Sequence, residues 1–233
     1  RRRHTRLRTV TGVQTCALPI LAAIIGGGVP NLVADLSCRN LSITTGSGDD
    51  NLRVAQTGFG GFSSFVRHDL NVNTGGGDDR LSVSAFSDPG IEALFTIGHD
   101  LNIDMGSGND LFGLRGPLIS HDLNVLLGSG QDGADLRFLD VGHDTLIDAG
   151  ADNDHVAIID NQFTHGQTTI LLGSGDDLLD LFGNVMKKGV IDGGDGRNDT
   201  LNTAFPAFPR NGKYQNNTIL VLNFEKFTEP KPG

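Results

Sequence analysis

Aspartate recurs at the end of a glycine-rich, five-residue motif along most of this chain. The motif occurs seven times, as GSGDD (46–50), GGGDD (75–79), GSGND (106–110), GSGQD (128–132), GADND (150–154), GSGDD (173–177) and GDGRN (194–198). Glycine turns expose backbone carbonyls, and Ca²⁺ prefers carboxylate and carbonyl oxygens as ligands. The motif therefore predicts calcium ligands at Asp49, Asp50, Asp78, Asp79, Asp110, Asp132, Asp154, Asp176 and Asp177.

Histidine recurs at a second fixed place, seven positions before the first glycine of a motif. It stands there at His68, His99, His121 and His143, followed in each case by Asp, while Arg39 takes the place in the first copy and His165 lies one position further away. One interpretation is a column that binds a transition metal or senses pH, because imidazole ligates metals and titrates near neutrality. The interpretation we favour is a stacked turn residue bonded to its own Asp or to the next repeat. Joint protonation would make the histidines repel unless the neighbouring Asp offsets the charge, which predicts a looser fold below about pH 6.

The spacing of the motifs indicates which elements must position these side chains. The first glycines are 29, 31, 22, 22, 23 and 21 residues apart, a period typical of solenoids. Apolar residues fall two and four places after the end of each of the first six motifs, from Leu52 and Val54 to Leu179 and Leu181, which is the alternation of a half-buried strand. A strand also precedes each motif, and short apolar runs such as Phe62–Val66 and Leu139–Val141 predict a third.

Units this small must stack to bury their apolar faces. We therefore expect an all-β, single-stranded parallel β-helix of about seven rungs, each of roughly 21–31 residues. A propeller would need longer, four-stranded blades.

Stacking in register would place equivalent aspartates in one column. Neighbouring charges about 4.8 Å apart repel by about 1 kcal/mol in water and by about 3–4 kcal/mol at an effective dielectric of 20. Three remedies are open: hydrogen bonds from turn amides, carboxylates splayed into solvent, or a hard cation bound between rungs.

Three of the motifs, read with the residues that follow, resemble the hemolysin-type (RTX) calcium-binding repeat GGxGxDxUx. They are GSGDDNLRV (46–54), GGGDDRLSV (75–83) and GSGDDLLDL (173–181). The resemblance implies that glycine carbonyls and Asp50, Asp79 and Asp177 bind calcium between successive turns, and more weakly Asp110, Asp132 and Asp154. The family repeats every nine residues without interruption, whereas this chain has one turn in about 22. Amides at Asn109, Gln131 and Asn153 predict a hydrogen-bonded ladder in the middle rungs.

The sequence divides into three parts. Residues 1–20 are basic and carry no repeat, and Val10–Ile20 resembles the translation of a sequencing adapter, so we expect an artefact of metagenomic assembly that replaces the true N-terminus. Residues 21–203 form the predicted β-helix, and residues 204–233 form a predicted C-terminal cap strand and tail.

Composition narrows the function. A net charge of −10 argues against nucleic acid and favours cations, and the lack of a long apolar run argues against a membrane span. Acids are spread evenly by the repeat, and a chain with no Trp and one Tyr lacks the aromatic platforms of many sugar clefts. We expect a non-catalytic, calcium-stabilised, RTX-like module with a structural or adhesin role, secreted or on the bacterial cell surface. Its partners would be calcium and an extracellular glycan or surface protein. A β-helix lyase or hydrolase acting on polysaccharides is the alternative.

Overall fold

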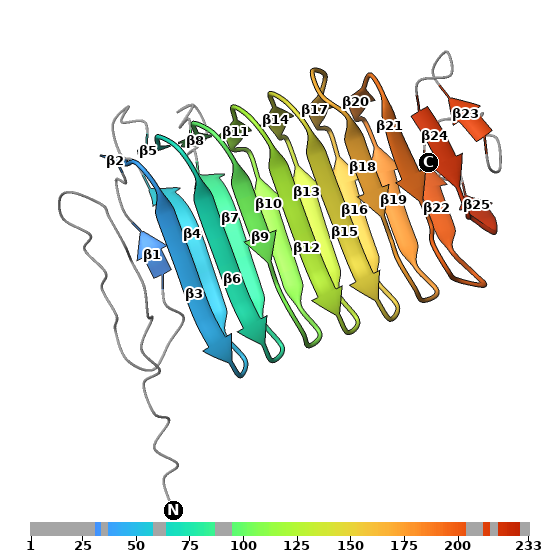
Figure 1. The fold of residues 1–233 in the computed structure, drawn as a ribbon, viewed down its shortest axis with the longest axis horizontal. Helices are drawn as coiled ribbons and strands as arrows, with labels where there is room; N and C mark the ends of the chain where they lie inside the picture. The colour runs from blue at the N-terminus through green and yellow to red at the C-terminus, as the bar shows by residue number, and fades with distance from the viewer. Residues whose placement is uncertain are drawn as a thin grey trace, which may run out of the picture.

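The computed structural model describes residues 31–33, 37–57, 64–86, 95–203, 212–214 and 219–228. The adapter-like segment lies outside the described residues. Every regular element in the described part is a β-strand, and no helix there is long and apolar enough to cross a membrane. The chain winds as a parallel β-helix, as the repeat predicts (Figure 1).

Three sheets run along the length of the β-helix, and consecutive coils contribute neighbouring parallel strands to each. Sheet A contains β1 (Asn31–Val33), β4 (Asn51–Thr57), β7 (Arg80–Phe86), β10 (Leu111–Arg115), β13 (Gly133–Arg137), β16 (His155–Ile159), β19 (Leu178–Phe182), β22 (Thr200–Thr203) and β25 (Lys226–Thr228). Sheet B contains the short strands β2 (Ser37–Cys38), β5 (Ser64–Val66), β8 (Phe95–Ile97), β11 (Leu118–Ile119), β14 (Asp140–Val141), β17 (Gln162–Phe163) and β20 (Val185–Met186). Sheet C contains β3 (Leu41–Ser47), β6 (Leu70–Gly76), β9 (Leu101–Asp104), β12 (Leu123–Ser129), β15 (Thr145–Ala151), β18 (Thr168–Leu171), β21 (Gly189–Asp192), β24 (Ile219–Leu222) and β23 (Gly212–Tyr214).

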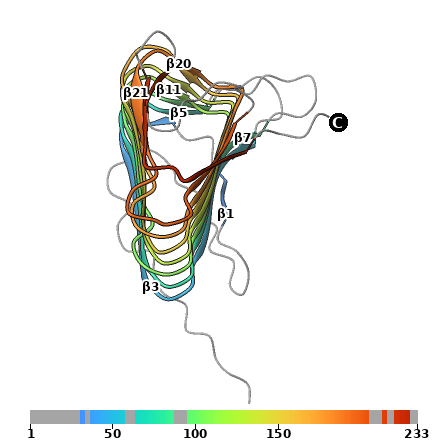
Figure 2. The ribbon, with the colours of Figure 1, turned by 90° about the vertical axis from the view of Figure 1, so that its right-hand side faces the viewer.

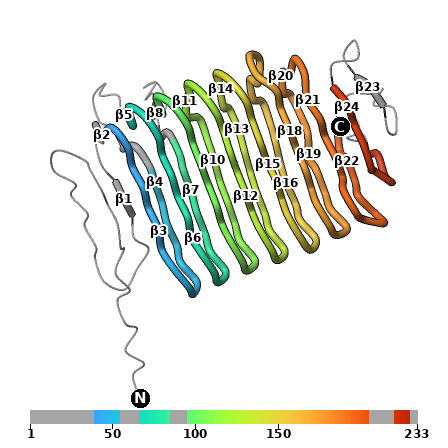
Figure 3. Tube along the Cα trace, viewed as in Figure 1, coloured from blue at the N-terminus to red at the C-terminus, as the bar shows by residue number. Residues whose placement is uncertain are grey.

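The cross-section of the stack is a narrow wedge (Figure 2). Sheets A and C face each other and meet at the glycine-rich turns, which lie along the lower edge in Figures 1 and 3. Sheet B closes the opposite, wider end of the wedge (Figure 2). Sheet B contains seven of the described strands, close to the expected count of about seven rungs, and these strands confirm the predicted third short strand.

The core lies between the three sheets and is built from the residues that the alternation selected. Leu81 and Val83 of β7 are 2% and 0% exposed, and Leu136 and Ile158 are both fully buried. Equivalent residues stack in register, since Leu52 pairs with Leu81 and Leu136 with Ile158. Each apolar position is therefore covered by the same position of the next coil, which supplies the burial that one unit lacks.

Glycine is required in the turns for two reasons. The first and third motif positions adopt positive φ in the second to sixth copies, as at Gly128 (109°) and Gly130 (120°), where residues with a side chain are strained. A Cβ on Gly128 would also lie 2.0 Å from the carbonyl oxygen of Gly106 in the preceding coil. Asp152 takes the third position in the fifth copy and keeps the positive φ, at 77°.

The C-terminal segment continues the stack before it is capped. β24 pairs parallel with β21, and β25 pairs parallel with β22, so a further coil follows the last motif. β23 then pairs antiparallel with β24 at the end of sheet C. The predicted cap strand is thus two strands of another coil, with β23 covering one exposed edge.

Candidate metal site

The predicted aspartates form one column inside the glycine turns. In each coil the aspartate Oδ1 accepts a hydrogen bond from the backbone N–H of the equivalent residue in the preceding coil, at 2.7–2.9 Å. We call this the inner aspartate column, and it comprises Asp50, Asp79, Asp110, Asp132, Asp154, Asp177 and Asp199. The amide hydrogen bonds are the first of the three remedies for stacked charge that the sequence left open.

The second carboxylate oxygen is buried without a protein partner in six members of this column. From Asp79 to Asp199 the residues are at most 4% exposed, and the Oδ2 atom of each is buried without a hydrogen bond. Burial outweighs the amide hydrogen bonds and raises the pKa of Asp79 and Asp199, with neighbouring carboxylates adding to the effect. For the same reasons the pKa rises to about 6 at Asp110, Asp132 and Asp177 and to about 8 at Asp154. The column therefore favours a bound proton or cation.

The acids that precede the column point outward instead. Asp49, Asp78 and Asp176 are exposed, so the paired acids of the motif do not share a site. They belong to an outer row in which a side-chain oxygen accepts the amide of the next coil, as Asp78 does from Asn109 at 2.8 Å. Asn109 and Asn153 accept in the same way from Gln131 and Asp176, which confirms the predicted ladder at these two asparagines.

The turn carbonyls are already used between coils. The carbonyls of Gly75, Gly106 and Gly150 accept hydrogen bonds from the amides of Ser107, Ser129 and Ser174, at 3.0–3.1 Å. The RTX resemblance implies instead that such carbonyls face a cation between turns. Among the carboxylates of the described turns, the Oδ2 atoms of the inner column from Asp79 to Asp199 are buried without a partner.

Asp199 belongs to the inner column but falls outside the motif as written. The last turn, which begins at Gly194, has one additional residue, so the aspartate stands after Asn198. Its Oδ1 accepts the amide of Asp177 at 2.9 Å, and its own amide donates to Glu225 Oε2 at 2.9 Å. The residue that follows, Thr200, pairs with Leu178 in register, and this strand register is the signal that identifies Asp199.

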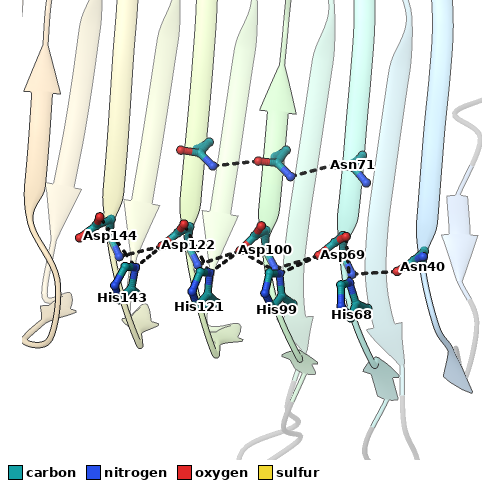
Figure 4. Close-up of polar contacts among 12 residues, drawn as sticks. Asn40, His68, Asp69, Asn71, His99, Asp100, His121, Asp122, His143 and Asp144 are labelled. Atoms are coloured by element: carbon teal, nitrogen blue, oxygen red, sulfur yellow. Dashed lines mark hydrogen bonds and ion pairs between the residues drawn. The ribbon is translucent and has the colours of Figure 1, made fainter.

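The histidines form a second column at the opposite end of the sheet C strands (Figure 4). The rings of His68, His99, His121 and His143 stack with centroids 4.4–4.7 Å apart and planes within 8–11° of parallel. We call these four residues, with Asp69, Asp100, Asp122 and Asp144, the histidine column. The stack and its bonds to Asp match the interpretation that the sequence favoured.

Each central aspartate of this column lies between two imidazoles. Asp69 Oδ1 accepts from His99 Nδ1 at 3.0 Å, and Asp69 Oδ2 lies 2.9 Å from His68 Nδ1. His121 Nδ1 and His143 Nδ1 likewise donate to Asp100 and Asp122 of the preceding coil, at 2.8 and 2.7 Å. Burial alone would raise the pKa of Asp69 and Asp122. Hydrogen bonds from imidazoles and backbone amides outweigh burial, so the net effect is a lowered pKa at both residues.

The histidine column ends where the repeat changes. At one end Arg39 and Asn40 take the places of His and Asp, and Asn40 Oδ1 accepts the Asp69 amide at 3.3 Å.

At the other end of the histidine column, the pairing of Thr145 with Thr168 sets Gly166 beside His143. His165 lies one position outside the column and contacts Thr164.

Searches of protein-family models, of curated proteins and of solved structures gave no match to this chain.

Proposed function

We propose that this chain is a non-catalytic β-solenoid module, secreted or displayed on a bacterial surface, that calcium stabilises at the inner aspartate column. The observation that supports the proposal is the run of six buried Oδ2 atoms without a partner. Neighbouring carboxylates are hydrogen-bonded to the backbone through one oxygen only, so a cation can be ligated by the other without breaking the coil-to-coil bonds.

Calcium suits this oxygen set better than a transition metal does. Hard divalent cations prefer carboxylate oxygens, and Ca²⁺ tolerates irregular geometry, whereas Zn²⁺ and Cu²⁺ favour nitrogen and sulfur ligands. Modules that work outside cells often bind calcium with dissociation constants of about 10⁻⁴–10⁻³ M. Asp79, Asp110, Asp132, Asp154, Asp177 and Asp199 would supply the ligands, and the ion would neutralise charge that otherwise favours separation of the coils.

Calcium titration monitored by thermal melting tests the proposal. Bound metal is first removed from the full chain with chelator at pH 8. We then expect added Ca²⁺ to raise the melting temperature by about 2–4 °C for each kcal/mol of stabilisation that calcium binding provides. Asp177→Asn removes an inner carboxylate and should weaken the calcium response, whereas Asp176→Asn changes only the neighbouring exposed acid and should preserve it. A melting temperature that is unchanged by calcium, or equal losses in both variants, would refute the assignment to the inner column.

The outer face of sheet A offers a surface for the adhesive role. An open groove crosses β4, β7, β10, β13, β16 and β19 and is lined by small residues such as Ser82, Gly113 and Gly133. Arg53, Arg80 and Arg137 border the same groove, together with Asp135 and Asp180. An extended extracellular glycan or a strand of a surface protein is the partner that this open, elongated shape favours.

The same groove favours the second candidate function, a polysaccharide lyase or hydrolase. It contains His155, whose Nε2 lies 2.8 Å from Asp180 Oδ2, and such a pair can move a proton. Cleavage of an acidic polysaccharide that is lost in His155→Gln, while glycan binding persists, would replace the non-catalytic proposal with this one. Binding without cleavage would support the adhesive module.

A further inference from the structure

The geometry points to the histidine column as a binding site for borderline divalent transition metals such as Zn²⁺, separate from the calcium proposal. Three overlapping groups bring their ligand atoms within 4.8 Å of one another: His68, Asp69 and His99; His99, Asp100 and His121; and His121, Asp122 and His143. Each group offers two imidazole nitrogens and one carboxylate. Imidazole suits Zn²⁺, Cu²⁺, Ni²⁺ and Fe²⁺, and zinc also accepts Asp or Glu oxygens in its coordination sphere.

The present spacing of these atoms is close to that of ligands on one metal ion. With bonds of about 2.0–2.2 Å, two ligand atoms of a tetrahedral zinc lie about 3.3–3.5 Å apart. The Nδ1 atoms lie 2.7–3.4 Å from the carboxylate oxygens of Asp69, Asp100 and Asp122 within these groups. All ligand atoms of a group lie within 4.8 Å of one another, and the four histidine side chains are 39–51% exposed, so small side-chain shifts at the surface can close each site.

The proton balance of metal binding is simple. A carboxylate can only accept, so the bonds to Asp place the proton of neutral His99, His121 and His143 on Nδ1. When a metal ion takes the Nδ1 lone pair, that proton moves through solvent to Nε2 of the same ring, and no net proton is released. His68 Nδ1 lies 2.9 Å from Asp69 Oδ2, and a proton on that nitrogen would move to Nε2 in the same way.

The overlap of the groups fixes a stoichiometry. The first and third groups share no residue, whereas the middle group shares His99 with one and His121 with the other. The chain can therefore hold two ions at once, one at His68, Asp69 and His99 and one at His121, Asp122 and His143. Solvent would complete each coordination sphere, because the column lies at the surface.

Zinc titration of the full chain by calorimetry tests this assignment, with Co²⁺ as a spectroscopic substitute. Excess Ca²⁺ is present throughout, so that oxygen sites are occupied and the result does not depend on the calcium proposal. We expect two zinc ions for the parent chain, one for His121→Gln, and none at the column for His99→Gln/His121→Gln. His165→Gln is the matched control, since His165 adjoins the column without joining it, and it should still bind two.

Circular dichroism of each variant in the same buffer checks that the coils remain folded. Visible Co²⁺ bands should show nitrogen ligation in the parent chain and disappear in the double variant. Absence of zinc binding by the parent chain, or equal stoichiometry in the parent and the folded double variant, would overturn the proposal.

Discussion

Asp132 accepts the backbone N–H of Asp110 through Oδ1 at 2.8 Å, while its Oδ2 is buried without a partner. One side chain thus links two coils and also carries a charge that the surroundings disfavour. The same relationship recurs from coil to coil, so the stability of the stack depends on what neutralises that charge.

The first prediction is that the metal-free protein becomes more stable as pH falls from 8 to 5. The pKa of Asp154 is raised to about 8 in the fold and is about 3.9 in an unfolded chain, so the folded state binds more protons throughout this range. The free energy of unfolding should therefore rise on acidification, and the melting temperature in chelator should increase by about 5 °C or more. Saturating calcium should reduce this pH dependence, because the bound cation then neutralises the carboxylate charge that a proton would otherwise neutralise.

This expectation opposes the acid loosening that the histidines alone predict. In the structure each imidazole that gains a proton lies beside Asp69, Asp100, Asp122 or Asp144, so protonation forms ion pairs as well as like-charge contacts. A melting temperature that falls steadily from pH 8 to pH 5 in chelator would show that the histidine column dominates the pH dependence of stability.

A second prediction concerns Asp154→Asn. Asparagine keeps an oxygen for the Asp132 amide and supplies N–H groups where carboxylates repel. In chelator at pH 8 we expect the variant to melt above the parent by about 2–4 °C for each kcal/mol gained, and the advantage should shrink at pH 5. Asp135→Asn, on the exposed face of β13, is the control and should change little.

A third prediction separates two glycines on neighbouring coils. Gly128→Ala combines positive φ with a Cβ 2.0 Å from the Gly106 carbonyl oxygen, and it should destabilise the fold by about 2–5 kcal/mol. Gly113→Ala meets no atom within 4 Å on a strand, and it should be neutral or stabilising by up to about 1 kcal/mol. Urea unfolding of both variants measures the difference, and similar losses would contradict the packing argument for the turns.

A fourth prediction concerns a buried asparagine pair. Asn161 is fully buried, accepts the Leu139 amide at 2.9 Å, donates to the Leu136 carbonyl at 3.0 Å and also bonds Asn184. Asn161→Ala leaves two backbone groups buried and unpaired, and should cost about 2–4 kcal/mol.

Asn124→Ala is the matched control for this pair. Asn124 is half-buried and donates to Asn102 at 2.8 Å in a row on the outer face of sheet C, so its removal should cost about 1 kcal/mol or less. Equal losses in the two variants would show that burial does not set the cost.

The sequence was sufficient to predict the architecture and the columns. The alternation of Leu81 and Val83 identified a strand face, and the fixed distance from Gly75 to Asp79 identified a residue that must recur in register. Both signals are local and repeated, so each coil provides the same information again.

Other features could not be predicted because they depend on side-chain direction and on the exact length of turns. Adjacent acids such as Asp176 and Asp177 look equivalent in sequence, yet one is exposed and the other is 2% exposed. Asp199 was missed because its turn is one residue longer, and Asn161 because nothing in its neighbours marks an inward-facing amide. Only the stacking of coils decides these cases.

The register described for sheet C makes each coil interchangeable with its neighbours. Leu123 pairs with Leu101 on one side and with Thr145 on the other, and residues 121–142 span 22 positions from one histidine to the next. Excision of that segment would bring β15 beside β9 with the same partners. Tandem duplication or loss of whole segments can therefore lengthen or shorten the rod during evolution while its thickness stays constant.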